Sequence, residues 1–114
     1  MALQATSRQV GDVAVIDLGG RITLGSESAI LRNTIRDLVE HGHRKILLNL
    51  ADVDYIDSAG IGELISAKAT VSRLSGDLKL LQLTKRVHDI LQITRLFTVF
   101  DIQSDEVVAV RSFG

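Results

Sequence analysis

Short apolar runs alternate with longer stretches of helical periodicity along this sequence. Three runs are rich in Val, Ile and Leu, and they span residues 13–18, 45–50 and 78–83. Such runs are typical of strands, and the last two are apolar at nearly every position, as in strands buried on both faces. Residues 3–10, before the turn pair Gly11-Asp12, are expected to pair with the first strand as a hairpin arm. A last strand is expected near residues 98–102.

Apolar residues recur with the spacing of a helix between these strands. Residues 26–40 form one such segment, and residues 58–74 form the clearest one. The expected apolar face of the second segment consists of Ile61, Leu64, Ile65, Val71 and Leu74. A shorter helix is expected after Thr84 and a final helical turn after Ser104.

This order of elements predicts an α/β fold. Strands that alternate with helices are joined by right-handed crossovers and pair in parallel, whereas the N-terminal hairpin adds one antiparallel edge. We therefore expect a mixed, mostly parallel sheet of four to five strands, with about four α-helices packed mainly on one side. A chain of 114 residues has room for one such core, so residues 1–114 are expected to form a single domain.

Composition and charge argue against several classes of function. The net charge is −1 and the 13 Lys and Arg residues are spread along the chain, so we expect no nucleic-acid partner. No apolar run is long enough to cross a bilayer, and the N-terminal residues do not resemble an export signal, so we expect no membrane insertion. The sequence has no cysteine, which excludes disulfides and suits the cytoplasm.

Residues 52–63 carry the most chemical information, because they join a central strand to the clearest helix. Ligands and partners of α/β sheets gather at such strand ends. Ser58 stands where the helix begins, and its hydroxyl is expected to cap the free backbone N–H groups there. Gly60 and Gly62 fall in the first helical turn, where a glycine costs up to about 1 kcal/mol relative to alanine. Either tight internal packing or the close approach of a partner would explain them.

The stretch Asp57-Ser58-Ala59-Gly60-Ile61-Gly62 resembles the phosphorylation-site motif of the STAS domain, in particular that of the bacterial anti-anti-sigma factors, or anti-sigma factor antagonists. The resemblance extends over nearly the whole chain. Gly20-Arg21-Ile22 resembles the turn after the family's second strand, and residues 48–53 resemble its next strand and loop. Residues 87–91 with Leu96-Phe97 resemble its third helix. The resemblance implies a STAS-type fold.

In that family the unphosphorylated protein binds an anti-sigma factor and so releases a sigma factor for transcription. The resemblance implies that an anti-sigma factor with serine kinase activity phosphorylates Ser58 and that a serine/threonine phosphatase reverses the modification. The chain would be a substrate of both and not an enzyme, with no cofactor and no metal. We expect a monomer when free, with a dimer left open. The partner-binding residues implied are Arg21, Thr23, Asp54, Tyr55, Asp57, Ser58, Ala59, Gly60, Ile61 and Gly62.

Two residues depart from the family pattern. Thr23 stands where many members carry an aspartate that contributes to the partner surface, and Arg95 stands where a glycine commonly ends the third helix. A phosphate on Ser58 would add about −1.5 to −2 charges at a helix N-terminus, which backbone amides can receive without unfolding the domain. In a docked complex that charge would lose its water beside Asp54 and Asp57, so phosphorylation is expected to weaken binding more than folding.

Three other interpretations use the same segment. A serine hydrolase would need a glycine two residues before Ser58, where the chain has isoleucine, so the nucleophile-elbow pattern fails. The spacing of Asp52, Asp54 and Glu63 fits part of a calcium loop, but Asp57 stands where that loop requires glycine. The alternative that stays open is a non-switching STAS scaffold, or an accessory subunit of a transporter or signalling complex, in which Ser58 is only a helix cap.

Overall fold

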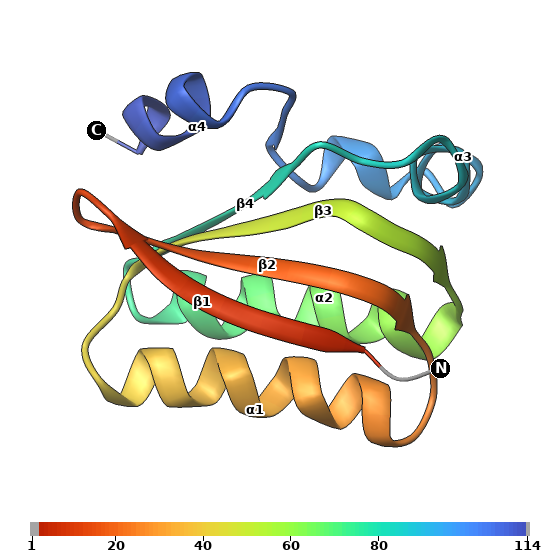
Figure 1. Ribbon diagram of the computed structural model, residues 1–114, viewed down its shortest axis with the longest axis horizontal. Helices are drawn as coiled ribbons and strands as arrows, with labels where there is room; N and C mark the ends of the chain where they lie inside the picture. Colours follow the sequence, from red (N-terminus) through yellow and green to blue (C-terminus); the bar gives the residue numbers. More distant parts are fainter. Residues whose placement is uncertain (1–2, 114) are drawn as a thin grey trace.

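The computed structural model describes residues 3–113, apart from the side chain of Phe97, and contains a five-stranded sheet and four α-helices (Figure 1). The strands are β1 (Gln4–Val10), β2 (Val13–Ile22), β3 (Lys45–Ile56), β4 (Asp77–Leu81) and β5 (Ile102–Gln103). The helices are α1 (Ser26–Glu40), α2 (Ser58–Arg73), α3 (Lys85–Ile93) and α4 (Glu106–Ser112), with a short 3-10 helix, η1 (Leu96–Thr98), before β5. In this part of the chain no helix combines the length and the apolar character that a membrane span requires.

The strands lie in the order β1-β2-β3-β4-β5. β1 and β2 are antiparallel, from Gln4 opposite Gly19 to Val10 opposite Val13, and the turn between them contains Gly11 at φ 61°. All other neighbouring strands are parallel, because a helix crosses over between each pair. The predicted α/β fold with a mixed, mostly parallel sheet is therefore confirmed.

Residues that alternate along the strands form two apolar clusters, one on each face of the sheet. α1 and α2 lie side by side along one face (Figure 1), where the main core includes Ile16, Leu48 and Leu80 from neighbouring strands. α3 adds Val87 and Leu91 to the same core. α4 lies over the opposite face and covers a smaller cluster of Val13, Val15, Leu47, Leu81 and Ala109. Most of the helical packing in residues 3–113 thus serves one core.

α4 is a helix of seven residues that is held at both ends. At its start, Glu106 forms an ion pair with Arg8 of β1. At its end, the Lys79 ammonium, on a side chain only 8% exposed, donates to the carbonyl oxygen of Ser112 at 3.0 Å and pairs with Asp101 at 3.1 Å. A helix of this length is not stable in water by itself, so these contacts and the smaller cluster keep it on the sheet.

β3 continues to Ile56, although its pairing with β4 ends at Asn49. The remaining length pairs with β2 up to Ile22, and α3 packs beside it, where the Thr84 hydroxyl donates to the carbonyl oxygen of Val53 at 2.8 Å. This extension was not predicted, because several polar residues interrupt the apolar run after residue 50. It carries the chain from the centre of the sheet to the start of α2.

Two details of the predicted elements are wrong. The strand expected at residues 98–102 is instead η1 followed by a two-residue strand, since the pairing with β4 involves Ile102 and Gln103.

On α2, Ile65 is 38% exposed and Leu74 is 43% exposed, so neither belongs to the buried face. That face is lined by small and apolar residues at helical spacing: Gly60, Ile61, Leu64, Ala67 and Val71. Small side chains in this row let α2 approach the sheet closely, and Leu74 lies beyond the last helical residue.

Candidate functional site

Asp57 joins the end of β3 to the start of α2, with an extended backbone at φ −103° and ψ −175°. Its side-chain Oδ1 accepts a hydrogen bond from the backbone N–H of Gly60 at 2.9 Å, and its carbonyl oxygen accepts from the N–H of Ile61 at 3.0 Å. These are the contacts of a helix N-cap, so the prediction that Ser58 caps this helix is wrong. Ser58 is the first helical residue, because the extended backbone that an N-cap requires lies one position earlier.

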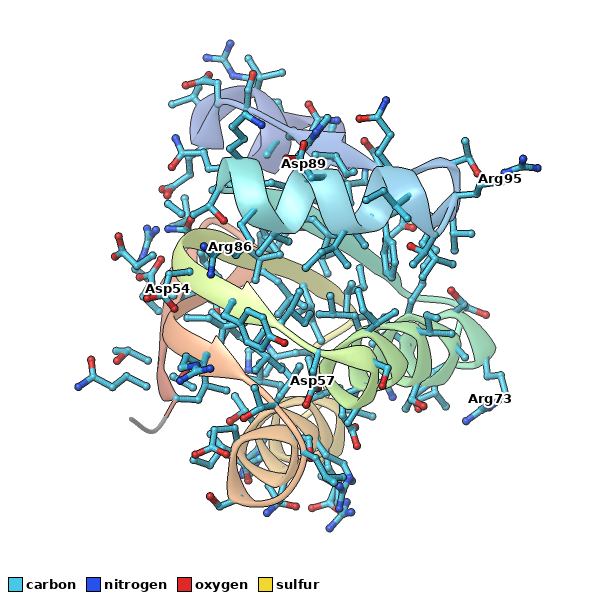
Figure 2. All side chains as sticks on the ribbon, turned by 90° about the vertical axis from the view of Figure 1, so that its right-hand side faces the viewer. Asp54, Asp57, Arg73, Arg86, Asp89 and Arg95 are labelled. Carbon is cyan, nitrogen blue, oxygen red and sulfur yellow. The ribbon has the colours of Figure 1, made fainter. Side chains whose placement is uncertain are left out.

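Asp57 also fastens the turn between β2 and α1 to this helix. Its Oδ2 accepts from the backbone N–H of Leu24 at 3.0 Å, and its own N–H donates to the carbonyl oxygen of Ile22 at 3.2 Å. The backbone N–H of Gly60, followed by that of Leu24, holds the pKa of the Asp57 carboxyl below its usual value, because both donate to the charged form. One ionised side chain thus links two segments at the end of the molecule that faces the viewer in Figure 2.

Ser58 presents its hydroxyl to solvent at the N-terminus of α2. The residue is exposed, and its hydroxyl makes no hydrogen bond within residues 3–113. The free backbone N–H groups of the first turn and the helix dipole favour negative charge at this point. Of the residues that follow, Ala59 is half-buried and Ile61 is only 8% exposed. Ile61 therefore supports the main core, and Ser58 is the accessible nucleophile of this motif.

The two glycines of the first turn have different surroundings. A Cβ at Gly60 would overlap the carbonyl oxygen of Ile22 and would lie 2.7 Å from Cγ1 of Ile56. The close approach of α2 to β2 and β3 therefore requires glycine there. A Cβ at Gly62 would meet nothing within 4 Å among the described residues. Internal packing explains Gly60 but does not explain Gly62.

Arg21 and Tyr55 stand opposite each other on the paired strands β2 and β3. The guanidinium carbon of Arg21 lies 5.0 Å from the centre of the Tyr55 ring, which is a cation–π contact. Asp54 is exposed, and Figure 2 shows it at the same end of the molecule as Asp57. Across residues 3–113, no group of three or more His, Cys, Asp or Glu side chains is arranged to hold a metal ion. The structure thus gathers the predicted polar residues at one end without a metal-binding geometry.

The turn between β2 and α1 contributes two further residues. Thr23 is half-buried, and its hydroxyl donates to Oε1 of Glu27 at 3.2 Å, which places a carboxylate beside it. Leu24 is 77% exposed and was not identified from the sequence. Its signal was weak, because it is a single apolar residue in a turn and its hydrogen-bond partner Asp57 comes 33 positions later in the chain.

Comparison with known proteins gives a consistent result. The family model of the STAS domain matches residues 4–109. The anti-sigma-B factor antagonist of Bacillus subtilis is 32% identical over 89 residues, which cover 78% of this chain and 80% of that protein. BtrV of Bordetella bronchiseptica is 27% identical over 75 residues, which cover 66% of this chain and 65% of that protein. The structure of the phosphorylated form of the Bacillus cell fate determinant SpoIIAA superposes with a TM-score of 0.74 at 19% identity, over 96% of this chain and 98% of that one.

Proposed function

Because this chain belongs to the STAS domain family, we propose that it acts as an anti-sigma factor antagonist. The unphosphorylated protein binds an anti-sigma factor and so releases a sigma factor, and phosphorylation of Ser58 ends that binding. The observation that carries the proposal is the exposed hydroxyl of Ser58 at the first residue of α2. The name of the Bacillus subtilis relative and the phosphorylated form of SpoIIAA support it.

The chain serves in this cycle as a substrate and not as an enzyme. The anti-sigma factor supplies serine kinase activity: Oγ of Ser58 attacks the γ-phosphorus of ATP, an O–P bond forms, ADP leaves, and the hydroxyl proton passes to a base on the kinase. A serine/threonine phosphatase hydrolyses the phosphoserine and returns the hydroxyl and inorganic phosphate. Both reactions take place in the cytoplasm, where the sigma factor acts.

The surroundings of Ser58 explain why a phosphate would affect binding more than folding. In the free protein the phosphate would stay in water beside the N-terminus of α2, whose dipole favours negative charge. In the complex it would lose that water close to Asp57, whose lowered pKa keeps it ionised, and near the exposed Asp54. A loss of about 3 kcal/mol in binding free energy would already weaken the complex more than about 100-fold.

The modification itself is tested by incubating the protein with the cognate anti-sigma factor and ATP and analysing it by mass spectrometry. We expect one phosphate, located on Ser58, and none on a Ser58→Ala variant. Ser66 and Thr70, farther along α2, serve as internal controls. A phosphate on either of them with Ser58 unmodified would overturn the assignment.

The effect on binding is tested with Ser58→Asp and Ser58→Ala, each titrated against the anti-sigma factor by calorimetry. Both variants keep the Asp57 cap, so both should unfold within a few degrees of the unmodified protein. We expect Ser58→Ala to bind and Ser58→Asp to bind at least about 10-fold more weakly, because only the aspartate brings a charge into the interface. Equal affinities of two folded variants would show that charge at this position is not the switch and would favour a non-switching scaffold.

A further inference from the structure

Two exposed apolar side chains lie on the segments that Asp57 joins, the turn between β2 and α1 and helix α2. Leu24 is 77% exposed in the turn between β2 and α1, and Ile65 is 38% exposed on α2. Ser58, Gly62 and Ile65 are spaced four and three residues apart, so they share one side of the helix. We call Leu24, Ser58, Gly62 and Ile65 together the Leu24 surface.

Leu24 is held in place and does not sit on a loose loop. Its backbone N–H donates to Oδ2 of Asp57 at 3.0 Å, while Oδ1 of the same carboxylate caps α2 through Gly60 at 2.9 Å. The position of Leu24 relative to Ser58 is therefore fixed by one side chain. An exposed apolar group whose backbone is already ordered loses little conformational freedom when a partner covers it.

Gly62 gives an independent sign that a partner covers this side of α2. A glycine inside a helix costs up to about 1 kcal/mol relative to alanine. Within the described residues nothing lies within 4 Å of where its Cβ would be, so the fold gains nothing in return. A partner whose backbone packs directly on the helix would require a residue without a side chain at this position.

We propose that Leu24 is the apolar anchor with which this protein holds the anti-sigma factor, and that a backbone segment of the same partner packs along Gly62 and Ile65. The inference rests on the proposed function and adds an apolar residue that anchors the contact. The anti-sigma factor is the occupant because the Leu24 surface contains Ser58, the residue that this partner is proposed to phosphorylate. The anti-sigma factor presents an apolar pocket to Leu24, and a leucine fully covered in such a pocket acts as a binding hot spot.

This arrangement also accounts for the sensitivity of the site to charge. Ser58 follows Asp57, to which Leu24 is hydrogen-bonded, and shares one side of α2 with Gly62 and Ile65, so we expect the docked partner to cover its hydroxyl. The Asp57 carboxylate is already satisfied by two backbone N–H groups and remains compatible with that contact. A phosphate on Ser58 would be stabilised in the free protein by water and by the N-terminus of α2, and the apolar contact would remove that water when the partner docks.

The test compares Leu24→Ala with the matched control Ile93→Ala in calorimetric titrations against the anti-sigma factor. Ile93, near the end of α3, is 81% exposed, so the two variants remove similar side chains from similarly exposed positions. We expect Leu24→Ala to raise Kd about 30-fold, which corresponds to about 2 kcal/mol, and Ile93→Ala to leave it within about twofold. Leu24→Met should restore most of the affinity, because methionine fills an apolar pocket of the same size.

The outcomes separate this inference from the proposed function. Thermal unfolding of each variant, run alongside, should match the unmodified protein, since both side chains are exposed. If the unmodified protein binds the anti-sigma factor while Leu24→Ala and Ile93→Ala bind equally well, the anchor is wrong and the proposed function stands. If the unmodified protein does not bind it at all, the proposed function is wrong and the anchor is overturned with it.

Discussion

Gly60 and Gly62 lie in the same helical turn, and alanine at these two positions should change stability in opposite directions. At Gly62 the added methyl group meets nothing within 4 Å in residues 3–113. Gly62→Ala should therefore raise the free energy of unfolding by up to about 1 kcal/mol, because alanine loses less backbone entropy in a helix. This gain needs no new contact.

At Gly60 the same methyl group has no room. It would overlap the carbonyl oxygen of Ile22, which also accepts the N–H of Asp57, so β2 would have to move. Overpacking costs about 1 to 3 kcal/mol, and the displacement of a hydrogen-bonded backbone puts this site at the upper end of that range. After the gain in helix propensity is deducted, Gly60→Ala should lose about 2 kcal/mol.

Urea denaturation followed by far-UV circular dichroism measures both effects. With unchanged m-values, the midpoint of Gly62→Ala should lie above that of the unmodified protein and the midpoint of Gly60→Ala below it. A destabilised Gly62→Ala, or a Gly60→Ala as stable as the unmodified protein, would refute the reasoning. Because Gly62→Ala is expected to be the more stable protein, weaker binding of this variant to the anti-sigma factor could not be attributed to unfolding.

Three further changes test other parts of the structure. Leu64→Ala should cost about 2 to 5 kcal/mol of unfolding free energy, since Leu64 is fully buried, whereas Ile65→Ala should cost less than about 1 kcal/mol. Similar losses for the two variants in chemical denaturation would contradict the assignment of the two faces of α2. Arg95 has φ 62° and ψ 21°, so Arg95→Gly should stabilise by about 0.5 to 1 kcal/mol in thermal unfolding, and a loss would show that this conformation carries no strain. The lowered pKa of Asp57 contributes stability above the unfolded pKa of about 4, and this stability is lost as the pH falls through the folded pKa. The difference in unfolding free energy between the unmodified protein and Asp57→Asn should therefore shrink between about pH 5 and pH 2. A difference that stays constant with pH would show that the Asp57 carboxylate is not its source.

The fold could be predicted from local pattern because its elements have strong periodic signals. Residues 45–50 and 78–83 are nearly continuous apolar runs, and the structure places β3 and β4 over most of them. The errors fall where tertiary contacts, and not local pattern, determine which residues are buried or paired. Ile65 and Leu64 are adjacent in sequence, and only the direction from which the sheet approaches α2 makes one exposed and the other buried. The extent of β5 likewise depends on which residues reach β4.

The binding roles of the candidate-site residues stay predictions, and the contacts among these residues could not be predicted from the sequence. Ser58 and Asp57 are both good helix caps, so local sequence does not decide between them, and the backbone of Asp57 settles the choice. The hydrogen bond from Leu24 to Asp57 joins residues 33 positions apart, and no local pattern reports it. The αL conformation at Arg95, by contrast, occurs at the position where the family commonly has glycine.

The dependence of α4 on the sheet has a consequence during synthesis of the protein. Residues 106–112 leave the ribosome after all five strands, because they follow β5 in the chain. Until then Val13, Val15, Leu47 and Leu81, each at most 1% exposed in the finished fold, have no helix over them. The nascent chain therefore carries an uncovered apolar face that attracts chaperones or other unfinished chains. Translation of the last helix closes that face.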